Sequence, residues 1–197
     1  MALAASAEEL ATVVARLGAE ISSALPGGAV LAAVLKGTTP FLADLCRAIS
    51  VPVTLEMLMV TPYTPGTGRV RIVKDLDGDV AGVDVVLVED IVDTGLTTAY
   101  LLGTLRQRSV ASVSVCALLD RTCRRVVPVP VRWRGREVGD EHLIGYGLDH
   151  EERYRNLPAL YGAPLQLLTG GRSDVDDALF GRDGSETLPR MSRERWQ

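Results

Sequence analysis

Three aliphatic segments that each end next to charged residues constrain the fold more than any other feature of this sequence. They cover residues 29–35, 84–88 and 113–119, and aliphatic side chains dominate each of them. Apolar runs of this length, without the alternation of a half-exposed strand, are typical of parallel strands that are buried on both faces. Between them, residues 39–49 and 97–108 carry apolar side chains at helical spacing. The pattern predicts an α/β fold: an open, mostly parallel twisted sheet flanked by helices.

An amphipathic helix is predicted before the first of these strands. Residues 6–24 have apolar positions at helical spacing, and Ser6 with Glu9 fits a capping box at the helix start. After the helical pattern at 39–49, residues 51–60 form another extended, apolar stretch. The first part of the chain therefore alternates between strands and helices, as a parallel sheet requires.

Turn-forming residues interrupt the middle of the chain and dominate its end. Residues 61–68, TPYTPGTG, precede an alternating segment at 69–73, which predicts a mobile loop between paired strands. A last core-like stretch at 143–148 is followed further on by a polar, glycine-rich tail. We therefore expect one domain at residues 1–169 and a peripheral C-terminal extension at residues 170–197.

Composition and charge argue against several classes of partner. A chain of 197 residues with 47% hydrophobic and 23% charged residues is typical of one globular domain. The net charge of −4 gives no general electrostatic reason to bind nucleic acid or an anionic membrane. No apolar run approaches the roughly 20 residues of a membrane-spanning helix, and the first residues lack the basic start of a secretory signal. We therefore expect a cytoplasmic protein that has neither nucleic-acid nor membrane partners.

Charged residues follow each of the three aliphatic segments. Lys36 and Gly37 follow the first segment, residues 89–97 follow the central one, and Asp120 with Arg121 follows the last. Open parallel sheets bind their ligands at the carboxyl ends of the strands. These three short segments are therefore expected to meet at one edge of the sheet and to form the functional site.

The central segment, EDIVDTGLT at 89–97, is the most informative. Two adjacent carboxylates, Glu89 and Asp90, precede Asp-Thr-Gly-Leu-Thr, which opens a helix. A helix amino end with small and hydroxylated residues binds phosphate through its backbone N–H groups and its dipole. A carboxylate pair would repel that phosphate unless Mg²⁺ or ribose hydroxyls lie between them. The segment therefore predicts a site for a sugar phosphate with a metal ion.

Other interpretations of this acidic segment are less complete. Each acid alone fits an ordinary solvated loop residue, and Thr97 fits a helix cap. Acid pairs at strand ends also occur in phosphate-accepting receiver domains and in haloacid-type hydrolases, in which an aspartate is the nucleophile. Neither class explains the Asp-Thr-Gly-x-Thr sequence that follows the pair, so the sugar-phosphate interpretation is favoured.

The central motif also resembles a known family. VVLVEDIVDTGLTT at 85–98 is similar to the phosphoribosyl pyrophosphate (PRPP) signature of type I phosphoribosyltransferases. Four further blocks resemble the hypoxanthine-guanine branch in order and spacing: VLKGTTPFLADLCRAI, VRIVKDLDGDVAG, CALLDRTCRR and IGYGLDHEERYRNLP. The resemblance covers about residues 7 to 162. It implies a small hood beside the sheet and the transfer of 5-phosphoribosyl from PRPP to hypoxanthine or guanine, with release of pyrophosphate.

The resemblance assigns roles to the residues at the strand ends. Glu89 and Asp90 would hold the ribose hydroxyls and help to place Mg²⁺, and Asp149 would form a second metal site that is reached through water. Asp93 would be the general base that removes the N7 proton of the purine. The full PRPP-binding set that the resemblance implies is Leu35, Lys36, Gly37, Glu89, Asp90, Asp93, Thr94, Gly95, Leu96, Thr97 and Arg155.

Two of these implied residues are the cations that would stabilise the departing pyrophosphate, Lys36 and Arg155. The peptide between Leu35 and Lys36 is expected to be cis, because it is typically cis in this family. A plainer interpretation of Arg155 is an ion pair with Glu151 across one helical turn.

The nucleobase pocket and the mobile loop depart from the family pattern. Arg121 stands where the family usually has a lysine that donates to the purine 6-oxo group. His142 stands where an aromatic ring usually stacks on the base. Leu143 would offer backbone groups to the base edge, with Asp149 nearby. The remaining departures are Leu96, which replaces a basic residue of the phosphate loop, and Pro62-Tyr63, which stands where relatives have a Ser-Tyr lid.

These departures leave three hypotheses. The first is purine salvage, and the second is the same reaction on a 7-deazapurine in secondary metabolism, which the changes at Arg121, His142 and Pro62 motivate. The third is a non-catalytic regulator that senses PRPP, but the presence of Asp93, Lys36 and Arg155 in an acidic chain favours an enzyme. Relatives are usually dimers or tetramers, so a homodimer or homotetramer is expected, with residues 51–60 apolar enough for an interface.

Overall fold

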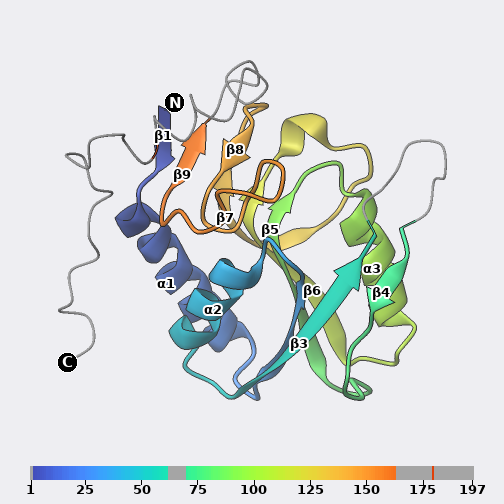
Figure 1. The fold of residues 1–197 in the computed structure, drawn as a ribbon. Helices are drawn as coiled ribbons and strands as arrows, with labels where there is room; N and C mark the ends of the chain where they lie inside the picture. Colours follow the sequence, from blue (N-terminus) through green and yellow to red (C-terminus); the bar gives the residue numbers. More distant parts are fainter. Residues whose placement is uncertain (1, 62–69, 163–178, 180–197) are drawn as a thin grey trace.

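A six-stranded sheet forms the centre of the molecule (Figure 1). The computed structural model describes residues 2–61, 70–162 and 179. The strands occur in the order β4-β3-β2-β5-β6-β7, and all neighbours are parallel except β4, which runs antiparallel to β3. Their bounds are β2 (Ala29–Val34), β3 (Val53–Val60), β4 (Ile72–Lys74), β5 (Asp84–Val92), β6 (Ser112–Asp120) and β7 (Val131–Glu137). The predicted open, mostly parallel α/β sheet is confirmed.

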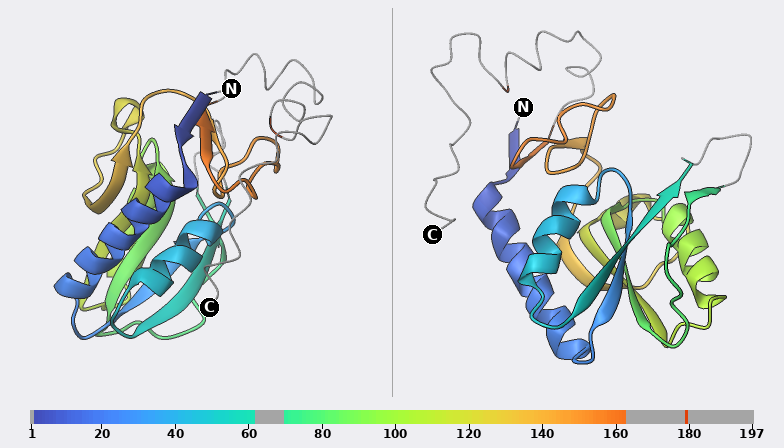
Figure 2. Two further views of the ribbon diagram at one scale, coloured as in Figure 1. Left: turned by 90° about the vertical axis from the view of Figure 1, so that its left-hand side faces the viewer. Right: turned by 60° about the horizontal axis from the view of Figure 1, so that its bottom comes forward.

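Helices cover both faces of this sheet, which explains the continuous apolar strands. Helices α1 (Ala7–Ala24) and α2 (Thr39–Ala48) lie on one face, and α3 (Leu96–Arg106) lies on the other (Figure 2). Along β2, Leu31 packs into the cluster that contains α1 and α2, whereas Val30 and Ala32 pack into the cluster that contains α3. Successive side chains of a strand point to opposite faces, so a strand between two helical layers is apolar at every position.

The start of α1 has the predicted capping box. The Ser6 hydroxyl accepts a hydrogen bond from the Glu9 backbone N–H at 3.2 Å, and the Ser6 backbone N–H donates to the Glu9 carboxylate at 2.8 Å. This reciprocal pair satisfies two N–H groups that have no partner within the helix.

The described part of the chain has no helix that is long and apolar enough to cross a membrane.

A second, three-stranded sheet forms the small hood. Its order is β1-β9-β8, with β1 (Ala2–Ala5), β9 (Leu160–Gly162) and β8 (Leu143–Ile144) paired antiparallel. The hood therefore joins the first residues of the chain to residues that follow the main sheet, and Figure 1 shows it beyond the end of β5. Sequence patterns did not predict β1 or β9, because both strands are too short for a recognisable period.

Two other predictions about the main sheet require correction. The arginines and prolines that follow residue 120 indicate irregular surface, but residues 131–137 form β7, an edge strand that pairs with β6 and buries Trp133. The acidic sequence at 89–95 predicts a loop, but residues 89–92 continue β5 and pair with β6 as far as Asp120. In both places hydrogen bonding to a neighbouring strand decides the structure, although the local sequence contains charged residues.

The mobile loop and the domain boundary fall mainly outside the described residues. Pro62 and Tyr63 lie outside them, but the flanking strands β3 and β4 pair as predicted. The expected boundary at residue 169 also lies outside them. In the extension, the structure describes Leu179, whose buried side chain joins a cluster with Ile144, Tyr154 and Leu157.

Candidate active site

The carboxyl ends of three adjacent strands bring the predicted charged residues together. Strands β2, β5 and β6 are neighbours and run parallel, so Lys36, Asp90 and Arg121 emerge at the same edge of the sheet. The peptide between Leu35 and Lys36 is cis, as expected. The Lys36 carbonyl accepts hydrogen bonds from the backbone N–H and the hydroxyl of Thr39, which lead directly into α2. The topology therefore builds the site from segments that are far apart in sequence.

The acid pair lies at the buried end of β5. Glu89 is 5% exposed, and its carboxylate accepts a 3.4 Å hydrogen bond from the Thr98 hydroxyl on α3. Burial, with a smaller contribution from the charge of Asp90, raises the pKa of Glu89 to about 8, against the lowering effect of Thr98. Burial also raises the pKa of Asp90, although the Ile91 N–H donates to this carboxylate at 2.8 Å. The pair is therefore ready to bind a ligand that compensates carboxylate charge.

Removal of the Glu89 charge is expected to stabilise the free chain at alkaline pH. The Glu89 carboxyl has a pKa of 4.5 when unperturbed and about 8 when folded. Between these values the folded chain retains a proton that the unfolded chain has released, so stability falls as pH rises through this window. We expect Glu89→Gln to raise the unfolding free energy by roughly 2–4 kcal/mol near pH 9 and by much less near pH 5. Urea unfolding at both pH values measures the difference, and an equal effect at the two would contradict it.

Close backbone contacts hold the acid pair against the two neighbouring loops. A Cβ added to Gly37 would lie 1.9 Å from the Asp90 carboxylate and 3.4 Å from the Arg155 guanidinium. Gly147 has a φ of +99°, and its added Cβ would lie 1.9 Å from the Gly37 carbonyl oxygen. A side chain does not fit at Gly147, because it would overlap a backbone oxygen, whereas a side chain at Gly37 would displace the Asp90 carboxylate. Sequence analysis did not identify Gly147 as part of this arrangement.

The two candidate pyrophosphate cations are paired with acids of the 149–152 turn. Lys36 Nζ lies 2.9 Å from a carboxylate oxygen of Glu152. Arg155 lies 2.9 Å from Asp149 and 3.4 Å from Glu152, and it also donates to the Gly147 carbonyl at 2.8 Å. The plainer interpretation of Arg155 is wrong, because Glu151 pairs with Arg153 at 3.9 Å and the segment forms turns instead of a helix.

The segment from Asp93 to Thr97 forms an open helix start. Gly95 has a φ of +82°, and its added Cβ would lie 2.4 Å from the Val127 carbonyl oxygen, so glycine is required there. Helix α3 begins at Leu96, whose N–H donates a long hydrogen bond of 3.4 Å to the Thr94 hydroxyl. The N-cap residue Gly95 has no side chain, so the next N–H groups of the first turn are available for a phosphate. Thr94 is held by the backbone N–H groups of Val126 and Val127, which donate to its carbonyl at 2.9 and 3.0 Å.

The two carboxylate oxygens of Asp93 differ in their hydrogen bonding. One carboxylate oxygen, Oδ2, accepts a 3.3 Å hydrogen bond from Arg121, whereas Oδ1 is buried and has no hydrogen-bond partner. A buried acceptor without a partner is unfavourable unless a ligand supplies the donor. This oxygen is therefore a candidate acceptor for an N–H group of a ligand.

The predicted nucleobase residues lie at the edge of the hood. Leu143 is buried in β8, and the His142 ring makes an edge-to-face contact with His150 at a centroid distance of 5.6 Å. Burial, together with His150, lowers the pKa of His142, so the neutral ring is favoured. The neighbouring Arg121 is 7% exposed and donates to the carbonyls of Gly139 and Glu141.

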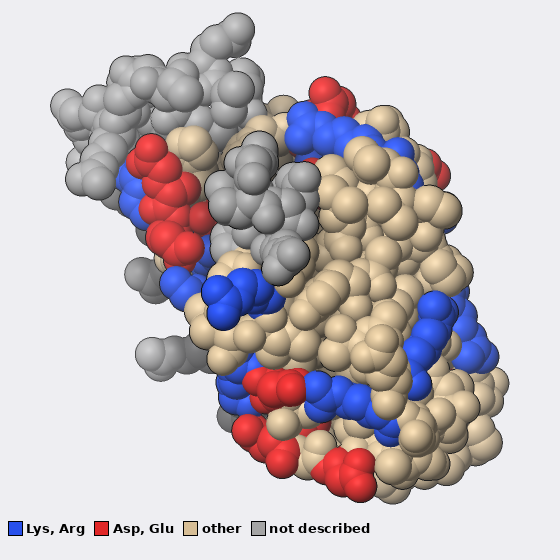
Figure 3. Space-filling view, turned by 90° about the vertical axis from the view of Figure 1, so that its right-hand side faces the viewer, with Lys and Arg blue, Asp and Glu red and all other residues tan. Residues whose placement is uncertain are grey.

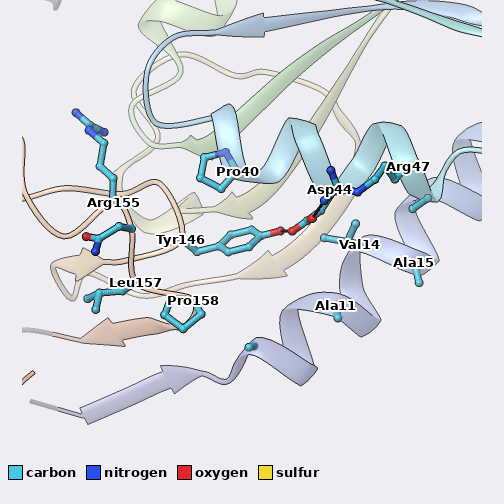
Figure 4. A pocket seen from close by; sticks show the side chains of 13 residues that line it. Ala11, Val14, Ala15, Pro40, Asp44, Arg47, Tyr146, Arg155, Leu157 and Pro158 are labelled. Carbon is cyan, nitrogen blue, oxygen red and sulfur yellow. Dashed lines mark hydrogen bonds and ion pairs between the residues drawn. The ribbon is translucent and has the colours of Figure 1, made fainter. Parts of the chain in front are cut away.

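A cavity of about 550 Å³ is lined by residues of α1, α2 and the segment 146–158 (Figure 4). Its walls are mainly apolar, with Val14 and Pro40 among them, and the Tyr146 hydroxyl donates to Asp44 at 2.5 Å. Among the predicted site residues, only Arg155 borders this cavity. The cavity is therefore distinct from the strand-end site.

A parallel sheet with an acid pair at the end of its central strand, followed by an uncapped helix start, is the arrangement of a phosphoribosyltransferase. Residues 6–151 match the phosphoribosyl transferase domain family. The chain is 43% identical over 153 residues to a hypoxanthine phosphoribosyltransferase of Haemophilus influenzae, covering 73% of this chain and 84% of that protein. It is 42% identical over 157 residues to the hypoxanthine-guanine phosphoribosyltransferase of Bacillus subtilis, covering 78% and 87%.

The fold comparison agrees with the sequence comparison. A crystal structure of a hypoxanthine-guanine phosphoribosyltransferase from Bacillus anthracis, with a HEPES molecule in its active site, superposes with a TM-score of 0.81 at 35% identity. The match covers 83% of this chain and 99% of that one. The chain belongs to the phosphoribosyltransferase family and, within it, to the hypoxanthine-guanine branch.

Proposed function

We propose that the strand-end site transfers 5-phosphoribosyl from PRPP to N9 of a 6-oxopurine, with Asp93 as the general base and pyrophosphate as the leaving group. The buried, unpartnered Oδ1 of Asp93 carries this proposal. A purine N7–H supplies the donor that this oxygen lacks, and a carboxylate within hydrogen-bond reach can remove that proton as N9 attacks C1 of the ribose. The product is a nucleoside monophosphate such as IMP or GMP.

The other residues hold the sugar diphosphate. The N–H groups at the start of α3 bind the 5′-phosphate, and Glu89 with Asp90 accepts hydrogen bonds from the ribose hydroxyls. Lys36 and Arg155 exchange their present carboxylate partners for the more highly charged pyrophosphate, which stabilises the charge that develops on the leaving group. The Leu35 to Gly37 turn lies beside the pyrophosphate, and its backbone N–H groups can donate hydrogen bonds to it.

The carboxylates of the site fit a magnesium ion that takes most of its ligands from water and substrate, and only a few from the protein. The described residues contain no group of three or more metal-ligating side chains. Mg²⁺ typically binds one or two carboxylates together with phosphate oxygens and waters, which Glu89, Asp90 and Asp149 can provide. When bound, the ion would neutralise charge on the pyrophosphate. The raised pKa of both acids of β5 agrees with a site that awaits a cation.

The same observation argues against a 7-deazapurine as the main substrate. A 7-deazapurine has carbon at position 7, so Asp93 Oδ1 would face a C–H group and stay without a hydrogen bond. A buried polar group that is left unpaired by an analogue produces strong discrimination against that analogue. The changes at Arg121 and His142 would then alter the choice among 6-oxopurines and leave the reaction class intact.

Pyrophosphate release with a panel of bases tests the proposed function. We expect turnover of hypoxanthine or guanine with magnesium PRPP, and a rate with the matching 7-deazapurine that is lower by a factor of about 100 or more. Mass spectrometry of the nucleotide product identifies the base that was used. Equal turnover of purine and deazapurine would overturn the role of Asp93, and no turnover of any base would overturn the enzymatic assignment.

A regulator that binds nucleic acid finds no support in the surface charge on the face shown in Figure 3. There, basic and acidic side chains are intermixed around a broad uncharged area. For the assembly, we propose a homodimer or homotetramer that uses residues 51–60, a range in which Leu55 is 43% exposed. Light scattering gives the subunit number directly.

A further inference from the structure

The segment from Arg121 to Val127 wraps around the loop that presents Asp93. The backbone N–H of Arg121 donates to the Val92 carbonyl at 2.9 Å, and the Arg125 guanidinium donates to the carbonyls of Val92 and Asp93 at 3.2 and 3.0 Å. With the two bonds to Thr94 described above, nearly every carbonyl of the loop is held by this one segment. The position of Asp93 is therefore set by residues 121–127.

Arg121 donates a hydrogen bond to the Asp93 carboxylate, whereas Arg124, whose terminal nitrogen lies 3.9 Å from the same oxygen, forms only a longer ion pair. The three nitrogens of Arg121 donate to three different acceptors: Nε to the Gly139 carbonyl at 2.9 Å, one terminal nitrogen to the Glu141 carbonyl at 2.8 Å, and the other to Asp93 Oδ2 at 3.3 Å. Because Arg121 is 7% exposed, these bonds are shielded from water. The guanidinium thus ties Asp93 to the segment that leads into the hood, and it leaves Oδ1 free for a ligand.

An inventory of donors shows why arginine suits this position. A guanidinium has five N–H groups in a rigid plane, so three inward bonds leave two N–H groups that can still meet a substrate oxygen. A lysine ammonium has three N–H groups, which the same inward acceptors would exhaust. An arginine can therefore position the base and face the purine together, whereas a lysine must give up one of these contacts.

We infer that Arg121 is a positioning residue for Asp93, in addition to its place beside the nucleobase, and that it keeps the Asp93 carboxylate turned so that Oδ1 faces N7. The inference rests on the proposed function, because it requires Asp93 to be the general base. Loss of the contact between Arg121 and Asp93 would then affect the chemical step more than the binding of PRPP, because Arg121 is not one of the proposed PRPP-binding residues.

A double-mutant cycle tests this inference on the full-length chain. We expect Arg121→Ala to lower kcat about 10- to 100-fold, with the KM for PRPP changed less than about threefold, since misplacing a catalytic group has effects of this size. In an Asp93→Asn background, Arg121→Ala should lower kcat less than about threefold further, because the group it positions is already absent. Additive losses in the two backgrounds would overturn the inference.

Chemical rescue separates positioning from a general loss of structure. Millimolar guanidinium should restore at least several-fold activity to Arg121→Ala, because the truncation leaves a buried space beside three acceptors. The matched control is Arg132→Ala, which removes an exposed arginine from β7; its rate should not respond to guanidinium. Arg121→Lys provides a milder variant if the alanine variant does not fold, and it should lower kcat by a smaller factor.

The outcomes distinguish this inference from the proposed function. If the parent enzyme is active and Asp93→Asn is inactive, but Arg121→Ala keeps full kcat, only the positioning role fails. If the parent turns over no purine, the proposed function fails. Calorimetric binding of PRPP to each variant shows that the fold and the phosphate site remain intact.

Discussion

Asp93→Asn is expected to lower kcat by about 10²- to 10⁴-fold, which is the usual contribution of a general base. Asparagine keeps the size of the side chain and can still accept at one position, but it cannot take a proton from the purine. The backbone carbonyls of the loop are also held by the Arg121 N–H and the Arg125 guanidinium, so the loss should arise in the chemical step and leave PRPP binding within about threefold. Steady-state kinetics with purine and PRPP, together with calorimetry of PRPP binding, measures both quantities.

Asp84→Asn is the matched control for this variant. Asp84 lies at the opposite end of the same strand, β5, where its carboxylate accepts a hydrogen bond from Ser112. The same chemical change at this position should leave kcat unaltered. Retention of full activity by Asp93→Asn would show that another group accepts the proton.

Gly37→Ala is expected to raise the KM for PRPP by about 10- to 100-fold. The new methyl group would lie 1.9 Å from the Asp90 carboxylate, well inside contact distance, and the Gly147 segment packs against the same turn. Overpacking of this kind costs about 1–3 kcal/mol, and here the displaced group is one that holds ribose and metal. Initial rates over a range of magnesium PRPP concentrations measure the effect.

Gly103→Ala provides the comparison for the glycine variant. Gly103 lies within α3 and has no heavy atom within 4 Å of its added Cβ. Alanine there should stabilise the helix by about 0.5–1 kcal/mol and leave the KM for PRPP unchanged. An unchanged KM for Gly37→Ala as well would mean that the turn at Lys36 does not bind the substrate.

The buried centre of the main sheet could be predicted because the information is local and contiguous, whereas β7 and the end of β5 could not. Each buried strand is a short aliphatic run, and the motif at 85–98 combines the end of a strand, an acid pair and a helix start in one segment. Parallel topology then brings the ends of β2, β5 and β6 to one edge without any further information.

The remaining features depend on contacts between distant residues and could not be predicted. The hood pairs Leu3 with Tyr161, and no period in four residues indicates such a partner. Glu152, and not Glu151, meets Arg155 because the segment bends through residues with positive φ. The hydrogen bonds from Arg121 to the carbonyls of Gly139 and Glu141 could not be predicted either, because every residue has a backbone carbonyl and the sequence does not indicate which one will accept.

The pairing of β1 with β9 has a consequence for the order in which the protein assembles during synthesis. Residues 2–5 are synthesised before the main sheet, but their partners at 160–162 are synthesised only after all of its strands. The main sheet can therefore fold while β1 is still unpaired, and the hood sheet forms last. We therefore expect a chain that ends before residue 160 to contain every strand of the main sheet but to lack the pairing of β1 with β9.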